Sequence, residues 1–313
     1  MPAAEPVGLP ATAISAPDEA ASDLQGAALA APAPAAVAQP AVAAWLRLLR
    51  SEMRLMLSRR RNQAGLGVLA AIPIVMAIAV KIADPSNQHQ GESFLASIVG
   101  NGFFVALAAL VVEIGLFLPL AIAMLSGDAV AGEAQIGTLR GLLVVPVPRT
   151  RLLATKYVAL VLGSFLGVLV VAVAGLVAGG ALFGLHPVAT LSGTTLALPV
   201  ALWRLLLVVL YVTAFLAALS ALGLFVSTLT EQPLGATVAV ALISTTMWIL
   251  DSIPQLGWLH PWLLVDKQVA LADMLRDPIY WPTMRLGLLT DLAYVVVFLL
   301  AAWARFADKD VSG

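Results

Sequence analysis

Six long apolar segments limit the folds that are open to this sequence. A helix needs about 20 apolar residues to cross the hydrocarbon core of a bilayer. The segments that meet this length are 64–83, 102–126, 157–183, 204–227, 235–253 and 286–304. Of the 313 residues 61% are hydrophobic and only 11% are charged, whereas soluble domains are about a quarter charged. The sequence therefore predicts an all-α integral membrane protein with six transmembrane helices.

Two segments of different composition precede the first apolar segment. Residues 1–43 are rich in alanine and proline and contain no lysine or arginine, which predicts a disordered cytoplasmic tail. Residues 44–62 place leucine and methionine side chains on one helical face and, on the opposite face, Arg47, Arg50, Arg54 and Arg61. A cationic amphipathic helix of this kind lies in the membrane interface; the alternative is a cytosolic helix that packs on a partner.

The distribution of basic residues predicts the orientation. If the N-terminus is cytoplasmic, six spans return the C-terminus to the same side, and the transmembrane domain occupies 63–313. Of the 17 Lys and Arg residues, five then lie outside or near the outer interface: Lys81, Arg204, Lys267, Arg276 and Arg285. Lysine and arginine concentrate in cytoplasmic segments. We therefore expect both termini in the cytoplasm of a bacterial-type cell, with the chain in its inner membrane.

Several classes of function lack their motifs in this sequence. There are no cysteines, the three histidines are far apart, and no HExxH or GxSxG pattern occurs, so we expect no metal site and no catalytic residue. No lysine has the glycine before it and the Ser or Thr after it that a P-loop needs. No basic tract is interleaved with aromatic residues, so we expect no nucleic-acid partner. The chain is therefore expected to be no enzyme and to bind no cofactor itself.

A polar, basic loop, residues 127–156, separates the second and third apolar segments. Ser126 or Asp128 could cap the start of a helix, and 129–143 then reads as a short helix lying across the cytoplasmic ends of the spans. Such a helix could occupy a groove on a partner, with Glu133 and Arg140 providing charged contacts. The alternative is an ordinary basic loop that only sets the topology.

This loop resembles the cytoplasmic signature of ABC-2 type transporter permeases. The matching residues are Gly132-Glu133, Gly137-Thr138-Leu139-Arg140, Leu142-Leu143, Pro146-Val147, Arg149 and Lys156. The resemblance extends over about 44–311 and implies the ABC-2 type exporter fold, with 44–62 as its elbow helix. It also implies an ATP-driven exporter in which a homodimer of this permease pairs with a separate ABC ATP-binding subunit, which holds ATP and Mg. The residues that would couple to that subunit are Glu133, Gly137, Thr138, Leu139, Arg140, Pro146 and Arg149.

Two alternative functions use the same scaffold. One is a membrane assembly factor, for example for a metalloenzyme. The other is a proton-coupled carrier with Glu113 as its proton site, because an ionisable group at this depth usually faces a protein interior or a wet cavity. Glu113 could also line the translocation path, or only pair with a hydroxyl group or with Arg204. A glycine stripe in the third span allows close helix packing, within the subunit or in a dimer: Gly163, Gly167, Gly175 and Gly179.

Overall fold

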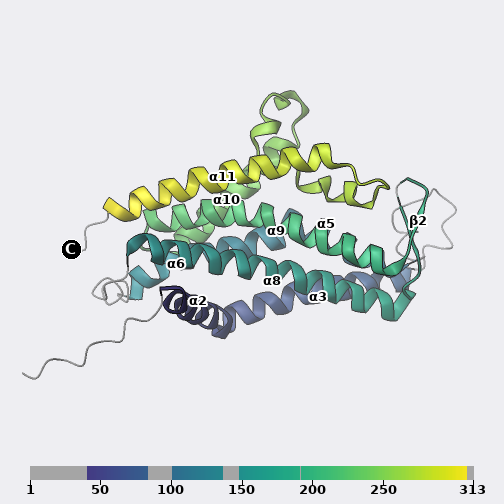
Figure 1. Ribbon diagram of the computed structural model, residues 1–313, viewed down its shortest axis with the longest axis horizontal. Coiled ribbons are helices and arrows are strands. Elements are labelled where there is room, and N and C mark those ends of the chain that lie inside the picture. Colours follow the sequence, from purple (N-terminus) through teal and green to yellow (C-terminus); the bar gives the residue numbers. More distant parts are fainter. Residues whose placement is uncertain (1–40, 84–100, 137–147, 191, 309–313) are drawn as a thin grey trace, which may run out of the picture. The chain divides into compact units, whose positions relative to one another are not determined.

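Eight α-helices make up most of the computed structural model, which describes residues 41–83, 101–136, 148–190 and 192–308 (Figure 1). They are α2 (Ala41–Ser58), α3 (Arg60–Ala83), α5 (Phe103–Gly115), α6 (Phe117–Ile136), α8 (Arg149–Phe183), α9 (Leu198–Leu229), α10 (Pro233–Asp251) and α11 (Trp281–Asp308). In these ranges six helices are long and apolar enough to cross a membrane: α3, α6, α8, α9, α10 and α11. The prediction of an all-helical protein with six spans is therefore confirmed.

The second predicted span differs from the structure. Residues 102–126 are not one helix, because the chain breaks at Leu116, whose φ and ψ of −144° and −57° are not helical. Pro119 explains the position of the break. A proline within a helix clashes with the carbonyl of the residue four positions earlier, which is here Gly115, the last residue of α5. The apolar segment therefore forms two helices, and the spanning helix α6 continues to Ile136.

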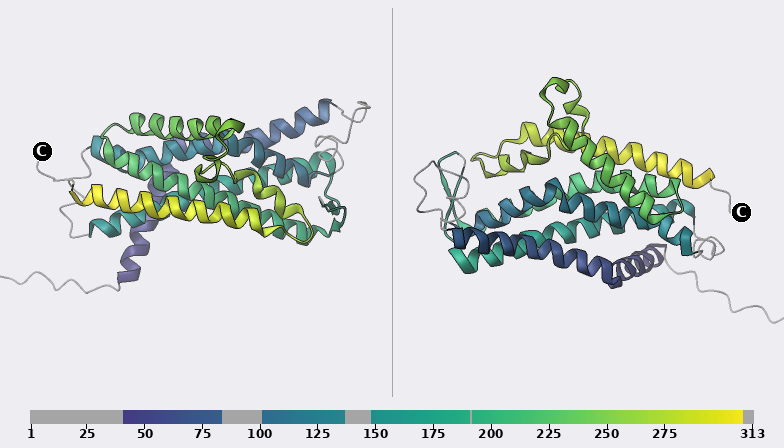
Figure 2. Two further views of the ribbon diagram at one scale, coloured as in Figure 1. Left: turned by 90° about the horizontal axis from the view of Figure 1, so that it is seen from above. Right: turned by 180° about the vertical axis from the view of Figure 1, so that it is seen from behind.

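The helix α9 lies inside the bundle, packed against α6, α8, α10 and α11 (Figures 1 and 2). Its sequence is apolar on all sides, which is the pattern of a buried helix. Buried side chains follow one another over most of its length, among them Val208, Phe215, Leu219 and Leu224. The interior of the bundle is thus formed around α9.

Glycines bring α5 and α8 into backbone contact. A Cβ atom on Gly179 of α8 would lie 2.1 Å from the carbonyl oxygen of Gly102, just before α5, and one on Gly175 would lie 2.6 Å from Cα of Ala106. Real Cβ atoms do not approach this closely, so only glycine fits at both positions. For Gly175 and Gly179, packing within the subunit is confirmed as the use of the glycine stripe.

Short elements connect α8 to α9 and α10 to α11. Between α8 and α9, the strands β1 (Val188–Ala189) and β2 (Thr195–Leu196) form an antiparallel pair. Between α10 and α11 the chain forms three 3-10 helices, η2 (Pro254–Leu256), η3 (His260–Trp262) and η4 (Gln268–Leu275), and η4 packs on α9 and α11. The strand pair was not predicted, because the expected fold was all-α.

The amphipathic segment predicted over 44–62 is divided between two helices. The helix α2 ends at Ser58 and α3 begins at Arg60, and α2 leaves α3 at a steep angle (Figure 2). The disordered tail was predicted over 1–43: residues 1–40 lie outside the described residues, whereas residues 41–43 belong to the first turn of α2 and are helical. We call the end of the bundle where α2 meets α3 the α2 end; it is the end predicted to face the cytoplasm.

Candidate functional site

A buried lysine connects three helices at the α2 end. Lys156, two turns into α8, is only 3% exposed. Its Nζ lies 2.5 Å from Oε1 of Glu133, in the last turn of α6, and 3.5 Å from Oε1 of Glu52 on α2. A charge in such a position is tolerated when opposite charges surround it. This contact therefore joins α2, α6 and α8 at one point.

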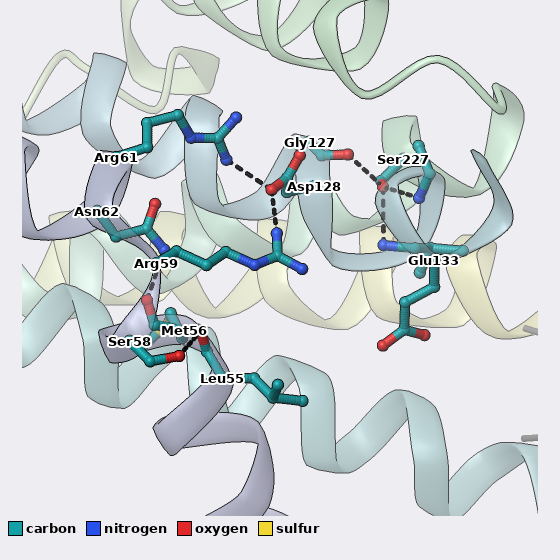
Figure 3. Close-up of polar contacts among 12 residues, drawn as sticks. Leu55, Met56, Ser58, Arg59, Arg61, Asn62, Gly127, Asp128, Glu133 and Ser227 are labelled. Atoms are coloured by element: carbon teal, nitrogen blue, oxygen red, sulfur yellow. Dashed lines mark hydrogen bonds and ion pairs between the residues drawn. The ribbon is translucent and has the colours of Figure 1, made fainter. Parts of the chain in front are cut away.

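A second group of ion pairs joins α6 to the corner between α2 and α3. Asp128 on α6 accepts hydrogen bonds from Nη1 of Arg59 and from Nη2 of Arg61, the latter at 2.5 Å (Figure 3). The Asp128 carboxylate is largely buried, whereas both guanidinium groups are partly exposed. Exposed ion pairs contribute little stability individually. One carboxylate shared by two arginines nevertheless holds the corner between α2 and α3 at a defined position along α6.

These six residues form one charge-balanced group, which we call the ion-pair cluster: Glu52, Arg59, Arg61, Asp128, Glu133 and Lys156. Five of them, with Met56, Asn62 and other side chains, line a cavity of about 60 Å³ between α2, α6 and α8. A polar cavity of this size has room for water. With three acidic and three basic groups, the cluster carries no net formal charge.

The hydroxyl of Ser227 forms hydrogen bonds with the backbone of α6 next to the cluster. Ser227, on α9, donates to the carbonyl of Gly127 at 2.8 Å and accepts from the backbone N–H groups of Val130 and Ala131 at 3.1 and 3.0 Å (Figure 3). Gly127 and Ala131 are four residues apart, so the hydroxyl bridges a donor and an acceptor that normally pair within a helix. This contact holds the last two turns of α6 against α9.

The structure describes only two of the predicted coupling residues. Glu133 lies in the last turn of α6 and contacts Lys156, and Arg149 is the first residue of α8. The other predicted coupling residues lie outside the described residues: Gly137, Thr138, Leu139, Arg140 and Pro146. The helices thus extend into both sides of the segment predicted as a loop over 127–156, and coupling through these residues remains a prediction.

The predicted helix start at Ser126 or Asp128 is wrong. The helix α6 passes through both positions without interruption. Ser126 Oγ donates to the carbonyl of Ile122 at 2.7 Å, as serine does in the middle of a helix, and Asp128 binds the two arginines. The described part of the segment predicted as a separate helix over 129–143 therefore continues α6 as far as Ile136.

Glu113 lies in α5, three residues before the break at Leu116, and is fully buried. Among the described residues neither carboxylate oxygen has a hydrogen-bond partner. The predicted alternative of a pair with Arg204 is wrong, because Arg204 donates instead to the carbonyls of Met274 and Arg276 and to Oδ1 of Asp277. A role of Glu113 in a translocation path remains a prediction.

A second polar group, which was not predicted from the sequence, lies in the connection between α10 and α11, beside the middle of α9 and α11. Ligand atoms of Asp251, His260 and Asp266 lie within 4.8 Å of one another, a spacing that could hold a metal ion. Nε2 of His260 lies 3.1 Å from the carbonyl of Ile253, and Lys267 forms an ion pair with Asp266. Lys267 therefore compensates the charge of Asp266, whereas Oδ1 of Asp251 is buried and has no hydrogen-bond partner among the described residues.

The fold and the cluster define the class of protein. Six apolar helices, five of them arranged about α9, with an ion-pair cluster at one end, describe a multi-pass helical membrane protein. The sequence model of the family described as "ABC-2 family transporter protein" matches residues 54–247, more than half of the chain. The chain therefore belongs to the ABC-2 family of transporter membrane proteins. A search of the curated proteins found no match.

Membership in this family has two consequences for the site. The matched residues include five members of the ion-pair cluster, and only Glu52 precedes them. The family also implies an ATP-binding subunit as partner and the membrane as location.

Proposed function

We propose that this chain is the membrane-spanning subunit of an ATP-driven exporter. It forms a homodimer in a bacterial-type inner membrane with both termini in the cytoplasm. It provides the translocation path, and it pairs with a separate ATP-binding subunit that holds ATP and Mg. Membership in the ABC-2 family supports the proposal. The arrangement of the ion-pair cluster supports the proposed coupling to the ATP-binding subunit.

The proposed coupling rests on the contact between Lys156 and Glu133. Residues 137–147, which include Gly137, Thr138, Leu139, Arg140 and Pro146, connect the end of α6 to the start of α8. The ion pair joins these two helices directly beside that connection, and Glu52 adds α2 to it. A force that the ATP-binding subunit applies to 137–147 would therefore move α2, α6 and α8 as one unit.

The test of coupling is ATP hydrolysis by the purified complex of both subunits. Removing a charged contact at an interface commonly costs about 2–5 kcal/mol when its partner is buried. We expect Arg140→Ala to abolish stimulation of ATP hydrolysis by substrate while the permease still inserts and dimerises. Arg305→Ala is the matched control, because Arg305 is an exposed arginine in the last turn of α11. If substrate still stimulated ATP hydrolysis in Arg140→Ala, residues 137–147 would only set the topology.

The proposed orientation has its own test. Reporter fusions after residue 313 and within 184–199 should report opposite sides of the membrane, because basic residues concentrate at the α2 end. Fusions that report the same side would overturn the six-span topology.

One observation favours a second function, a proton-coupled carrier. Glu113 is a buried carboxyl group in an apolar helix, and neither oxygen has a hydrogen-bond partner among the described residues. Such groups in membrane helices often take part in proton pathways. A pH gradient would then drive transport without ATP, which is the measurement that separates the two functions.

A further inference from the structure

An apolar cavity of about 210 Å³ lies between α3, α6 and α8, beside the corner where α2 meets α3. Its walls are almost entirely apolar and include Leu66, Leu69, Phe117, Ala121 and Leu166. A closed apolar cavity of about 150 Å³ is large enough to bind benzene. This cavity therefore has room for a short stretch of hydrocarbon chain.

The cavity opens on the outside of the helix bundle. Two of its lining residues, Val68 on α3 and Leu120 on α6, are 52% and 41% exposed. Exposed apolar side chains on membrane-spanning helices face the hydrocarbon of the bilayer. The cavity is therefore accessible from the lipid phase, and an apolar chain can enter it without crossing water.

One end of the cavity carries a basic side chain. Arg61 and Asn62 line that end, at the start of α3, and Arg61 is already paired with Asp128. Arg60, which precedes it in the sequence, and Arg54, on α2, are exposed, and neither forms an ion pair with any part of the chain that the structure describes. Arginines beside an apolar cavity suit an amphiphile with an anionic head group and a hydrocarbon chain.

We propose that this cavity binds one acyl chain of an anionic phospholipid from the cytoplasmic leaflet, with the lipid phosphate at Arg54 and Arg60. The choice of leaflet rests on the orientation proposed above. The bound chain would lie between α3 and α6, next to the corner that the ion-pair cluster holds. Lipid composition would then affect how firmly α2 and α3 are held on α6.

The test uses the full-length protein in lipid nanodiscs that contain phosphatidylglycerol with a photoreactive group on its acyl chain. After illumination, mass spectrometry locates the labelled peptides. In the wild type we expect labelling to concentrate on the cavity walls, in 62–69, 117–125 and 163–167. Labelling spread evenly over all lipid-exposed helices would overturn the proposal. Because this measurement needs neither ATP nor transport, its failure would leave the proposed function intact.

Two glycines of α3 provide a matched pair of variants. A Cβ atom on either Gly65 or Gly67 would meet no atom within 4 Å, but only Gly65 lines the cavity. Gly65→Leu should fill the cavity and lower labelling of its walls about tenfold, since the space for the chain is lost. Gly67→Leu changes the same helix in the same way and should label like the wild type. Equal labelling in both variants would show that the cavity is not the binding site.

The head-group contact is tested with charge variants. Arg54→Gln combined with Arg60→Gln should reduce labelling by phosphatidylglycerol to the level given by phosphatidylcholine. Arg47→Gln is the control, because Arg47 is an exposed arginine earlier on α2. If phosphatidylcholine labels the wild type equally, the anionic lipid is the wrong occupant.

A second copy of this chain is the competing occupant of the cavity. The chain contains no cysteine, so Val68→Cys places a single thiol at the cavity opening. Disulfide-linked dimers through this thiol would show that protein covers the cavity, and they would overturn the lipid proposal. We expect monomers under oxidising conditions.

Discussion

Nζ of Lys156 lies 2.5 Å from Oε1 of Glu133, so an almost fully buried ion pair joins the two helices on either side of residues 137–147. Both residues belong to the pattern that resembles the ABC-2 signature. The structure gives a physical reason for two parts of that pattern to occur together, because Glu133 and Lys156 contact each other within the subunit. The pattern therefore includes an internal contact in addition to any surface for a partner.

Removal of Lys156 should destabilise the α2 end. Lys156→Met leaves Glu133 and Glu52 without their shared positive charge, and breaking a buried ion pair from one side costs about 3–5 kcal/mol. We expect a clearly lower Tm in detergent micelles. The double variant Lys156→Met with Glu133→Gln should recover part of this loss, because an uncompensated charge is removed.

The control for this experiment is Lys81→Met, a change of an exposed lysine in the last turn of α3. Nζ of Lys81 lies 5.4 Å from the centre of the Phe183 ring, and an exposed cation–π contact contributes about 0.5–1 kcal/mol, so the Tm of Lys81→Met should fall much less than that of Lys156→Met. A Lys156→Met variant as stable as Lys81→Met would mean that the cluster does not hold the helices together.

Ser227→Ala should loosen the end of α6. The variant removes the hydroxyl that bridges Gly127 and Ala131, and loss of a buried hydrogen-bond partner costs about 1–3 kcal/mol. Hydrogen exchange of the backbone amides in 127–136 should become faster. Ser220→Ala serves for comparison, because its hydroxyl lies 3.4 Å from Ser164 Oγ, a weaker contact on the same helix. Equal exchange in both variants would contradict the bridging role.

Gly179→Ala should be strongly destabilising. The added Cβ would lie 2.1 Å from the carbonyl oxygen of Gly102, and overpacking of this kind typically costs about 1–3 kcal/mol. Gly67→Ala provides the contrast, because a Cβ there meets no atom within 4 Å. In a helix interior, alanine is more favourable than glycine by about 1 kcal/mol. The Tm of Gly67→Ala should therefore rise. A Gly179→Ala variant with unchanged Tm would show that the helices can separate without cost.

Glu113→Gln separates the two proposed sources of energy. Glutamine keeps the shape and hydrogen-bonding capacity of the side chain but cannot take up or release a proton. We expect the variant to retain most ATP-dependent transport in reconstituted vesicles, and a pH gradient alone to drive none. Transport by the isolated chain in response to a pH gradient, lost in Glu113→Gln, would replace the exporter by the proton-coupled carrier.

The spans were predictable from the sequence because a helix needs about 20 apolar residues to cross the hydrocarbon core of a bilayer. It did not reveal the break at Leu116, because the apolar composition continues across it. Pro119 was the available signal, since its ring excludes the carbonyl of Gly115 from a continuous helix. The hydrophobicity of the segment concealed this local steric effect.

The contacts of the ion-pair cluster were beyond prediction for a different reason. Lys156 and Glu52 are 104 positions apart, and residues so distant in sequence meet only through the packing of several helices. Glu133 itself was predicted as a coupling residue from its resemblance to the family pattern. Opposite charges at the ends of three helices were a weak signal that a cluster could form there.

The backbone contact between Gly102 and Gly179 gives α8 a fulcrum. Lys156 lies about 35 Å from Gly179 along the helix, at a rise of about 1.5 Å per residue, and the glycines allow no gap between the two backbones. A rod that is held near one end and pulled at the other tilts; it does not slide. Under the proposed coupling, α8 would then act as a lever, with its largest displacement at Lys156 and almost none at Gly179.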